Sequence, residues 1–402
     1  MSKENPIDGT CDPRFESVRE VFSQRIQDGH EVGAAIAFTL NGESVVDLWG
    51  GHTDKAKTQP WEQDTLVNTY STTKGMTAIC AHRLVEQGRL DLDAPVTKYW
   101  PEFGQAGKEA IPVSWLLSHQ GGIPAIRKSM PEGSLYDWGA MCDGLAESEP
   151  WWTPGTKHGY HPVTFGHLVG EVLRRIDGRS VGQMFREDVA EPLQADFHIG
   201  LDAKHDARTS DMIGGLVPDQ DKKKDGEKSA GPKPTGAMAD FMRDMTDPTT
   251  MVGSAFNNPP IRTGAVNSRE WRAAEIPAAN GHGTARALAR IYGALSIGGE
   301  VDGVRILEAD SIVRARTEQC SGPDATLAGM PMRYGLGFML QSPFMPLSPS
   351  TNAFGHPGAG GSIGMADPDA GVGFGFTMNK MGVGLVGGAT GFAVLKAFFK
   401  SL

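Results

Sequence analysis

Strand-forming and helix-forming residues are separated along this chain. Near the start, two β-rich runs, Gly33–Leu40 and Glu43–Trp49, flank an Asn-Gly pair, which is a strong signal for a β-hairpin. Near the end, Gly371–Met378 is another strand-type run, whereas the chain between about 95 and 270 is mostly helix and loop. This distribution predicts an α/β lobe that is built by both ends of the chain, with a helical lobe inserted.

The predicted fold class is α/β (α+β), with an antiparallel central sheet flanked by helices and an inserted, mostly helical lobe. We place the α/β lobe at residues 1–65 together with 275–402, and the helical lobe at 66–274. A chain of 402 residues, of which 39% are hydrophobic, is long enough to bury cores of this size. Ligand sites favour the junctions between lobes, so we expect the functional site there.

Helical periodicity marks six segments. They are 14–28, Ser71 to about Gln87, Val113–Leu117, Thr164–Ile176, Ala285–Leu295 and Val386–Leu402. Gly88 is a candidate C-cap after the second segment, and Thr284 is a candidate N-cap before the fifth. The helix from Ser71 carries a buried stripe of small and branched apolar residues, which predicts a central position.

Composition and charge exclude several classes of protein. A formal net charge of −10 argues against nucleic acid as a partner. No run approaches the roughly 18 apolar residues of a membrane span, and the first residues lack the apolar core of a signal peptide. The four cysteines are far apart and form no C-x-x-C pair: Cys11, Cys80, Cys142 and Cys320. We expect reduced thiols in a cytoplasmic protein.

Three short patterns favour ordinary structure over a second activity. The Lys-rich segment 219–236 is typical of a solvated surface loop. Residues 360–364 fit G-x-S-x-G, but no histidine follows Ser362 and a strand, not a helix, is predicted next. Residues 382–387 fit G-x-G-x-x-G, but no acidic residue follows, so a dinucleotide site is not indicated. We find no metal or nucleotide motif.

Ser71 and Lys74 lie three residues apart at the start of a predicted helix. This spacing places a hydroxyl and an amine on one helical face. A lysine that loses its proton beside a serine makes that serine a nucleophile. Lysine titrates near roughly 10.4 in water, and burial lowers its pKa because the charged form is disfavoured. Ser71 is therefore a candidate nucleophile and Lys74 its candidate base.

Two further segments can complete an acyl-transfer site. Tyr160 lies in a turn before a predicted helix, where a phenol can pass a proton between a serine and a leaving alkoxide. The Gly-rich segment 356–361 precedes a β-type run, and its glycines allow the backbone to approach a ligand closely. A backbone N–H from this segment, with that of Ser71, can hold a developing oxyanion.

Taken together, Ser71-x-x-Lys74, Tyr160 and His356-x-Gly358 resemble, in order and spacing, the serine β-lactamase and penicillin-binding-protein superfamily. Two flanking segments are also similar to this superfamily: 84–93 and 116–124. The resemblance spans about 15 to 395. Within the superfamily, the chain is most similar to the family VIII carboxylesterases, which share the class C β-lactamase fold.

Two motifs depart from the class C β-lactamase pattern. The Tyr-x-Asn of those enzymes is replaced here by Tyr160-His161-Pro, so the asparagine amide is missing. Their Lys-Thr-Gly is replaced by His356-Pro-Gly358, which leaves the carboxylate of a β-lactam with a weaker partner. Both changes favour neutral ester substrates, and family VIII esterases often have Tyr-His in the second motif.

By position, the resemblance implies a role for each motif residue. Ser71 is the nucleophile, Lys74 the base and Tyr160 the proton shuttle, and the N–H groups of Ser71 and Ala359 form the oxyanion hole, with the second donor lying within 358–361. The candidate substrate-binding residues are His356, Gly358, His161 and Trp152. The other histidines singled out, His119, His158, His167 and His282, are expected to be structural or solvated.

The sequence therefore predicts a serine esterase that acts on short-chain or aromatic esters through an acyl-enzyme, without a cofactor or metal. Its expected partner is a small-molecule ester, and neither nucleic acid nor a membrane is expected. On the same fold, the alternatives are a β-lactamase, a D-aminopeptidase or an acyltransferase. From another class, a non-catalytic binding protein remains an alternative. Oligomeric state and physiological substrate stay open, because loops form the pocket walls.

Overall fold

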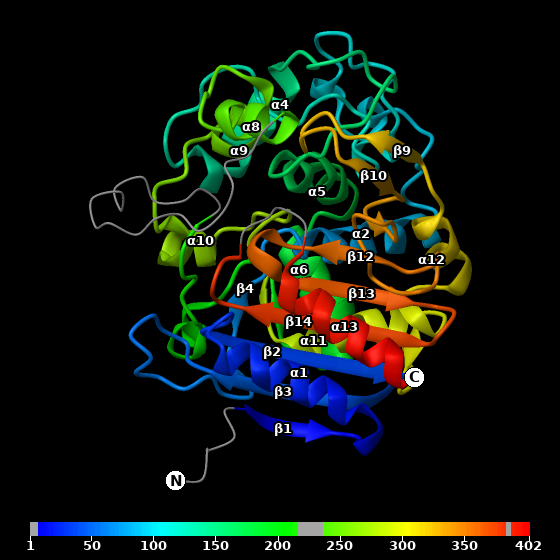
Figure 1. Cartoon of the computed structure of the whole chain (residues 1–402). Coiled ribbons are helices and arrows are strands. Elements are labelled where there is room, and N and C mark those ends of the chain that lie inside the picture. Colours follow the sequence, from blue (N-terminus) through cyan, green and yellow to red (C-terminus); the bar gives the residue numbers. More distant parts are fainter. Residues whose placement is uncertain (1–6, 216–235, 383–386) are drawn as a thin grey trace.

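A nine-stranded antiparallel sheet lies at the centre of the computed structural model, which describes residues 7–215, 236–382 and 387–402 (Figure 1). Its strands are β1 (Ile7–Cys11), β2 (Gly33–Leu40), β3 (Glu43–Gly51), β9 (Cys320–Pro323), β10 (Pro331–Tyr334), β11 (Met339–Leu340), β12 (Phe354–Pro357), β13 (Ile363–Asp367) and β14 (Val372–Met378). Their order is β1-β3-β2-β14-β13-β12-β11-β10-β9. Strands from the two ends of the chain therefore meet where β2 pairs with β14.

Short strands form two smaller sheets. They are β4 (Val67–Asn68), β5 (Phe197–His198) and β6 (His282–Gly283), which pair with one another, and β7 (Glu300–Val301) with β8 (Val304–Arg305). The β4–β6 pair matters for the site because the chain continues from β4 directly into the turn that carries Ser71.

Six of the thirteen α-helices in the described residues correspond to predicted segments. The thirteen are α1 (Glu16–Gln27), α2 (Thr73–Glu86), α3 (Val113–Leu117), α4 (Trp138–Glu147), α5 (Thr164–Asp177), α6 (Val181–Phe185), α7 (Glu191–Leu193), α8 (Ala237–Asp244), α9 (Met251–Asn257), α10 (Arg269–Ala273), α11 (Ala285–Ser296), α12 (Ala309–Arg316) and α13 (Ala389–Ser401). The six predicted helices correspond to α1, α2, α3, α5, α11 and α13. Both predicted caps are confirmed: Gly88 has a left-handed φ of 67°, and the Thr284 hydroxyl accepts from the N–H of Ala287.

The predicted hairpin is also confirmed. Asn41 and Gly42 connect β2 to β3 with φ values of 52° and 86°. Two successive positive φ values are the geometry of the tight turn that matches the twist of a hairpin, and asparagine and glycine tolerate it best.

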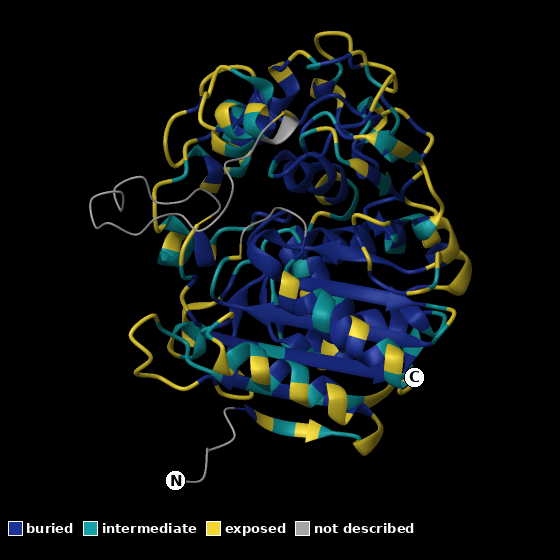
Figure 2. Cartoon of the chain, viewed as in Figure 1, coloured by how far each residue is buried: buried dark blue, intermediate teal, exposed yellow. Residues whose placement is uncertain are grey.

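Helices cover both faces of the sheet. On one face, α1 and α13 lie side by side in front of the strands (Figure 1), and Phe38 of β2 stacks on Phe398 of α13 with ring centroids 4.1 Å apart. On the other face, α11 crosses β14 at close range: a Cβ at Gly375 would lie 2.1 Å from the carbonyl oxygen of Ala285. With both faces covered, β12, β13 and β14 are buried throughout (Figure 2).

The helix α2 occupies the middle of the molecule. It contacts α5 and α6 on one side and β12 of the sheet on another, and eleven of its fourteen residues are buried. Its apolar residues join one large core cluster with those of α5 and α11. The first turn of α2 is therefore held at the boundary between the sheet and the helical part of the chain.

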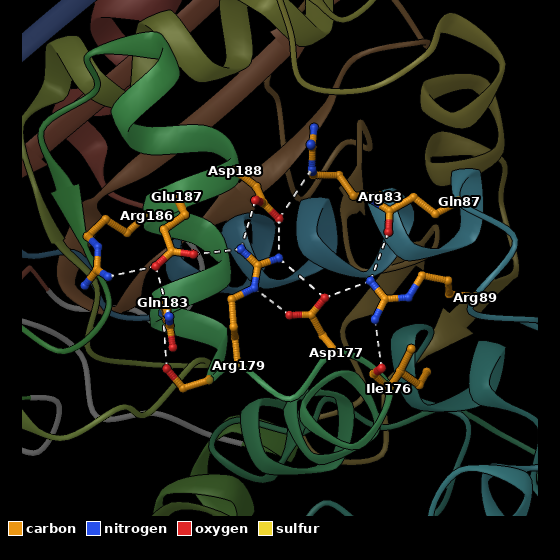
Figure 3. Close-up of polar contacts among 11 residues, drawn as sticks. Arg83, Gln87, Arg89, Ile176, Asp177, Arg179, Gln183, Arg186, Glu187 and Asp188 are labelled. Atoms are coloured by element: carbon orange, nitrogen blue, oxygen red, sulfur yellow. Dashed lines mark hydrogen bonds and ion pairs between the residues drawn. The ribbon is translucent and has the colours of Figure 1, made fainter.

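A network of ions fixes the opposite end of α2 (Figure 3). Arg179 donates to Asp177 at the end of α5, at 2.6 Å, and to Asp188 in the π-helical turn after α6, at 2.9 Å. Arg89, just after α2, donates to Asp177 at 2.8 Å. Arg179 lowers the pKa of the Asp177 carboxyl, which is consistent with an ion-paired network. The ends of α2, α5 and α6 are thus fastened to one another.

Some predictions are tested by the fold only in part. The Lys-rich segment 219–236 and the Gly-rich motif 382–387 fall largely outside the described residues. All four cysteines lie in described parts of the chain and are free. None of the helices in the described ranges combines the length and apolar character needed to cross a bilayer. The lobe boundaries at 65/66 and 274/275 stay predictions.

Glu31, between α1 and β2, is a buried carboxyl whose charge opposes folding at neutral pH. Only 9% of the residue is exposed. Burial raises the pKa of Glu31 from its ordinary value of 4.5 to about 7, against the opposing effects of Thr390 and Lys380. Between these two pH values the folded state keeps a proton that the unfolded chain has released. Stability therefore decreases as pH rises through this window.

We expect Glu31→Gln to remove this loss of stability at high pH. In urea unfolding at pH 8, the variant should be more stable than the wild type by about 1–3 kcal/mol, whereas at pH 5 the two should differ little. Glu20→Gln, at an exposed position of α1, is the control and should show no such dependence on pH. A gain of equal size at pH 5 and pH 8 would contradict the assignment.

Candidate active site

Ser71 lies in a tight turn and not in the helix itself. The helix α2 begins at Thr73, two residues later than predicted, because the preceding backbone turns sharply at Tyr70, whose φ is 47°. The N–H of Lys74 still donates to the carbonyl of Ser71 at 3.0 Å. A left-handed, non-glycine residue is costly and is found most often at functional sites. Here it presents the Ser71 side chain beside the first turn of α2.

The Lys74 amine is completely buried and lies among three oxygens. Its Nζ is 3.2 Å from Oγ of Ser71, and it donates to the carbonyl oxygens of Pro162 at 2.7 Å and Ala278 at 2.9 Å. A carbonyl oxygen can only accept a hydrogen bond. A neutral amine has two N–H groups and one lone pair. In that form, with both protons on the carbonyls, the lone pair is left for the Ser71 hydroxyl.

Electrostatics favour this neutral form. Burial lowers the pKa of the Lys74 amine well below its ordinary value, because a charge in the interior loses its hydration. No ion pair to Lys74 is present among the described residues. The predicted pair of a serine hydroxyl with a dry amine is therefore present in the structure.

Tyr160 brings a phenol to the same place. Its ring centroid lies 4.7 Å from Nζ of Lys74. Burial raises the pKa of Tyr160, the Ser71 side chain opposes this increase, and the nearby charge of Asp324 adds to it. The side chain is therefore a neutral phenol that can donate a proton.

The segment 358–361 is tied to the turn of Ser71. Ser362 donates from Oγ to the carbonyl of Thr69 at 2.7 Å, and its Oγ lies 3.0 Å from Oγ1 of Thr72. The N–H of Gly358 is used by the carbonyl of Ser362, at 2.7 Å. This hydrogen bond removes the Gly358 N–H as a candidate oxyanion donor.

The backbone hydrogen bonds narrow the choice of oxyanion donors. In the described ranges, the N–H groups of Ser71, Ala359 and Gly360 have no backbone acceptor among the bonds outside regular elements. Ala359 is the first residue of a short 3-10 turn, where an N–H has no partner within the turn. The pair of Ser71 and Ala359 stays a prediction.

His356 lies beside Tyr160 as a neutral ring. The two ring centroids are 5.9 Å apart. Its Nδ1 lies 2.7 Å from the carbonyl of Pro357, so Nδ1 carries the proton and Nε2 is a bare acceptor. Burial lowers the pKa of His356 to about 3. This position of the third motif therefore carries no positive charge at neutral pH.

His161 is held by backbone groups on both sides. Its Nδ1 donates to the carbonyl of Gly159 at 2.7 Å, and its Nε2 accepts from the N–H of Ile123 at 3.1 Å. The ring is completely buried. These contacts do not support direct binding of a substrate; they fasten the loop of Tyr160 to the loop that follows α3.

The remaining predicted residues are buried as well. Trp152 is 7% exposed and packs against Gly159, next to Tyr160, and no contact places it on Ser71. The other histidines are buried and not solvated: His119, His158, His167 and His282. Ser362 is followed by β13 and not by a helix, which rules out the nucleophile elbow.

Sequence reasoning missed Asp324 and the two carbonyls that hold Lys74. Asp324 follows a Ser-Gly-Pro sequence that reads as an ordinary turn, and its only distinguishing feature, burial to 1% exposure, has no local signal. A carbonyl group belongs to every residue, so no residue type reveals the contribution of Pro162 or Ala278.

Gly358 is predicted to be irreplaceable on steric grounds. A Cβ there would lie 2.2 Å from both Oγ of Ser362 and the carbonyl oxygen of Thr69. We expect Gly358→Ala to lower stability by about 1–3 kcal/mol or more, measured by thermal unfolding. Gly139→Ala is the matched control, because its new Cβ on exposed α4 has only one neighbour, at 3.4 Å; it should be neutral or stabilising. An unchanged melting temperature for Gly358→Ala would contradict the close approach.

Comparisons with known proteins identify the family of the chain. A family model described as Beta-lactamase matches residues 18–395. Esterase/beta-lactamase LipL of Mycobacterium tuberculosis is 36% identical over 380 residues, which cover 93% of this chain and 83% of LipL. A penicillin-binding protein homologue from Caulobacter crescentus and a family VIII carboxylesterase each have a solved structure with 40% identity and a TM-score of 0.86, covering 98% of this chain and 100% of theirs.

Proposed function

Because the chain belongs to the Beta-lactamase family, we propose that it is a serine hydrolase that cleaves carboxylic esters through an acyl-enzyme on Ser71. Membership confirms the resemblance and the fold class predicted from the sequence. The observation that carries the proposal is the buried Lys74 amine, which donates to two carbonyls and whose Nζ lies 3.2 Å from Oγ of Ser71.

The proposed reaction begins with attack by Ser71 on the ester carbonyl. Lys74 accepts the hydroxyl proton as the bond between Oγ and carbon forms, and the N–H groups of Ser71 and Ala359 bind the developing oxyanion. The bond to the alcohol then breaks, and Tyr160 gives its proton to the departing oxygen. Lys74 then passes its proton to the phenolate of Tyr160, which restores the phenol. Water repeats the sequence to release the acid.

The charge at the third motif favours a neutral substrate. His356 is uncharged at neutral pH, so it offers no ion pair to a substrate carboxylate. An ester with no charge near the scissile bond needs no such partner. The names of LipL and of the family VIII carboxylesterase support ester hydrolysis. We infer short-chain or aromatic esters as the substrate class.

β-Lactam hydrolysis is the second candidate. The name of LipL includes that activity, and the Ser71, Lys74 and Tyr160 arrangement suits any acyl transfer. The neutral His356 argues against efficient binding of a β-lactam carboxylate. Comparison of nitrocefin with a neutral ester therefore distinguishes the two.

Replacement of Ser71 tests the proposal directly. We expect Ser71→Ala to lower the hydrolysis of p-nitrophenyl acetate by at least about 10³-fold and to abolish labelling by a fluorophosphonate, because the nucleophile is gone. Ser362→Ala, at the other serine of interest, should still be labelled. The same preparations are assayed with nitrocefin, and wild-type turnover of nitrocefin that matches the ester would favour the second candidate. Retained ester hydrolysis by Ser71→Ala would contradict the proposal.

The pH profile tests the role of Lys74. Only the neutral amine accepts a proton, so kcat/KM should fall as pH decreases and the amine becomes charged. Because burial lowers the pKa of Lys74, activity should persist at pH 7, far below the ordinary range of lysine. Lys74→Arg keeps a permanent charge and should therefore be inactive over the whole assay range, about pH 6 to 9.

Lys108 provides the control for this experiment. It is also a buried lysine, and its Nζ donates to the carbonyls of Gln105, Ala146 and Ser148. Lys108→Arg should keep the shape of the wild-type profile, whatever its stability. Recovery of Lys74→Arg at high pH would show that another group acts as the base.

A further inference from the structure

The backbone of Tyr160 is held by a segment far away in the sequence. Its N–H donates to both carboxylate oxygens of Asp324, at 3.1 Å and 3.0 Å, and its carbonyl accepts from the hydroxyl of Thr326 at 2.7 Å. Between these two contacts, the N–H of Ala325 donates to the carbonyl of His158 at 3.1 Å. The segment after β9 therefore clamps the loop that presents the phenol to Ser71.

Asp324 is a buried anion whose partners are all neutral. Besides Tyr160, it accepts from the N–H and the hydroxyl of Thr326, at 2.8 Å and 2.9 Å, and from the phenol of Tyr334 at 2.7 Å. Donors on every side are the pattern of an ionised carboxylate. Within the described part of the chain it forms no ion pair, although it is only 1% exposed.

The negative charge of Asp324 influences the protonation of the groups around it. A nearby negative charge disfavours a phenolate and favours a protonated amine. Accordingly, the charge of Asp324 raises the pKa of Tyr160, in addition to the effect of burial. Loss of a proton is thereby discouraged at Tyr160 until an alkoxide is present to take it.

We propose that Asp324 is a positioning residue that holds Tyr160 as the proton donor to the leaving alcohol. This inference rests on the proposed esterase function and adds a residue that acts through Tyr160 without touching the substrate. The proton balance of the step is closed: the carbon–oxygen bond breaks, its electrons stay on the alcohol oxygen, and that oxygen takes the phenol proton. Lys74, protonated during attack, returns a proton to the phenolate.

The dependence on leaving group separates this role from a structural one. An alkoxide must be protonated as it departs, whereas p-nitrophenolate is stable and needs little help. Ethyl acetate and p-nitrophenyl acetate form the same acetyl-enzyme, and kcat/KM reports the step that forms it. A variant with fewer folded molecules loses both activities equally. A variant with a misplaced proton donor loses more kcat/KM for ethyl acetate than for p-nitrophenyl acetate.

The experiment compares three variants, each with active sites counted by fluorophosphonate labelling of Ser71. Tyr160→Phe removes the donor and should reduce kcat/KM for ethyl acetate about 10²-fold more than for p-nitrophenyl acetate. Asp324→Asn keeps the shape of the side chain but replaces one of the two oxygens that accept from the N–H of Tyr160 by an NH2 donor, and the preferential loss should be about tenfold. Tyr334→Phe is the matched control: it deletes one hydrogen bond to Asp324 but keeps the charge and the clamp, so the ratio should not change.

Thr326→Val supplies a second test if Asp324→Asn does not fold. It removes the hydroxyl that donates to the carbonyl of Tyr160 and leaves Asp324 in place, and the ethyl ester should again be lost preferentially. An unchanged ratio in Asp324→Asn or in Thr326→Val, beside a changed ratio in Tyr160→Phe, would overturn the role of Asp324 alone. An unchanged ratio in Tyr160→Phe would overturn the donor role in the proposed function as well.

Discussion

The dry amine of Lys74 is the constraint on which the arrangement of this site depends. An amine without water must place its protons on protein oxygens, and the carbonyls of Pro162 and Ala278 accept from it at 2.7 Å and 2.9 Å. These carbonyls come from the loop before α5 and from the loop before β6. The position of α2 relative to both loops is therefore set by two hydrogen bonds of a single side chain.

Packing around the amine makes those carbonyls available. Thr77, one turn after Lys74, donates to the carbonyl of Pro277 at 2.6 Å. The helix α5 approaches the same segment so closely that a Cβ at Gly166 would lie 2.6 Å from the N–H nitrogen of Ala278. The ion network at the far end of α2 completes the support (Figure 3). Helices, and not loops alone, therefore surround the amine.

Burial also keeps the histidines around this amine uncharged. Burial lowers the pKa of His161 and of His356 to about 3. The ring of His161 fastens the loop of Tyr160, and the ring of His356 belongs to the third motif. The remaining charge near the phenol is that of Asp324, which is stabilised by neutral donors. Acyl transfer in such a site depends on the movement of single protons among an amine, a hydroxyl and a phenol.

The sequence by itself determined the features that depend on near neighbours. These features are the hairpin at Asn41 and Gly42, the six predicted helices and the pairing of Ser71 with Lys74. Each follows from residues within one or two turns of each other. The roles of Tyr160 and His356 come from the resemblance to a family, and the structure brings the two ring centroids to 5.9 Å from each other. Tertiary structure alone decided the rest: the contacts of Lys74 with Pro162 and Ala278 span 88 and 204 residues, and that of Tyr160 with Asp324 spans 164. No local pattern reports such contacts, because backbone carbonyls look alike in every sequence and burial is a property of the whole fold.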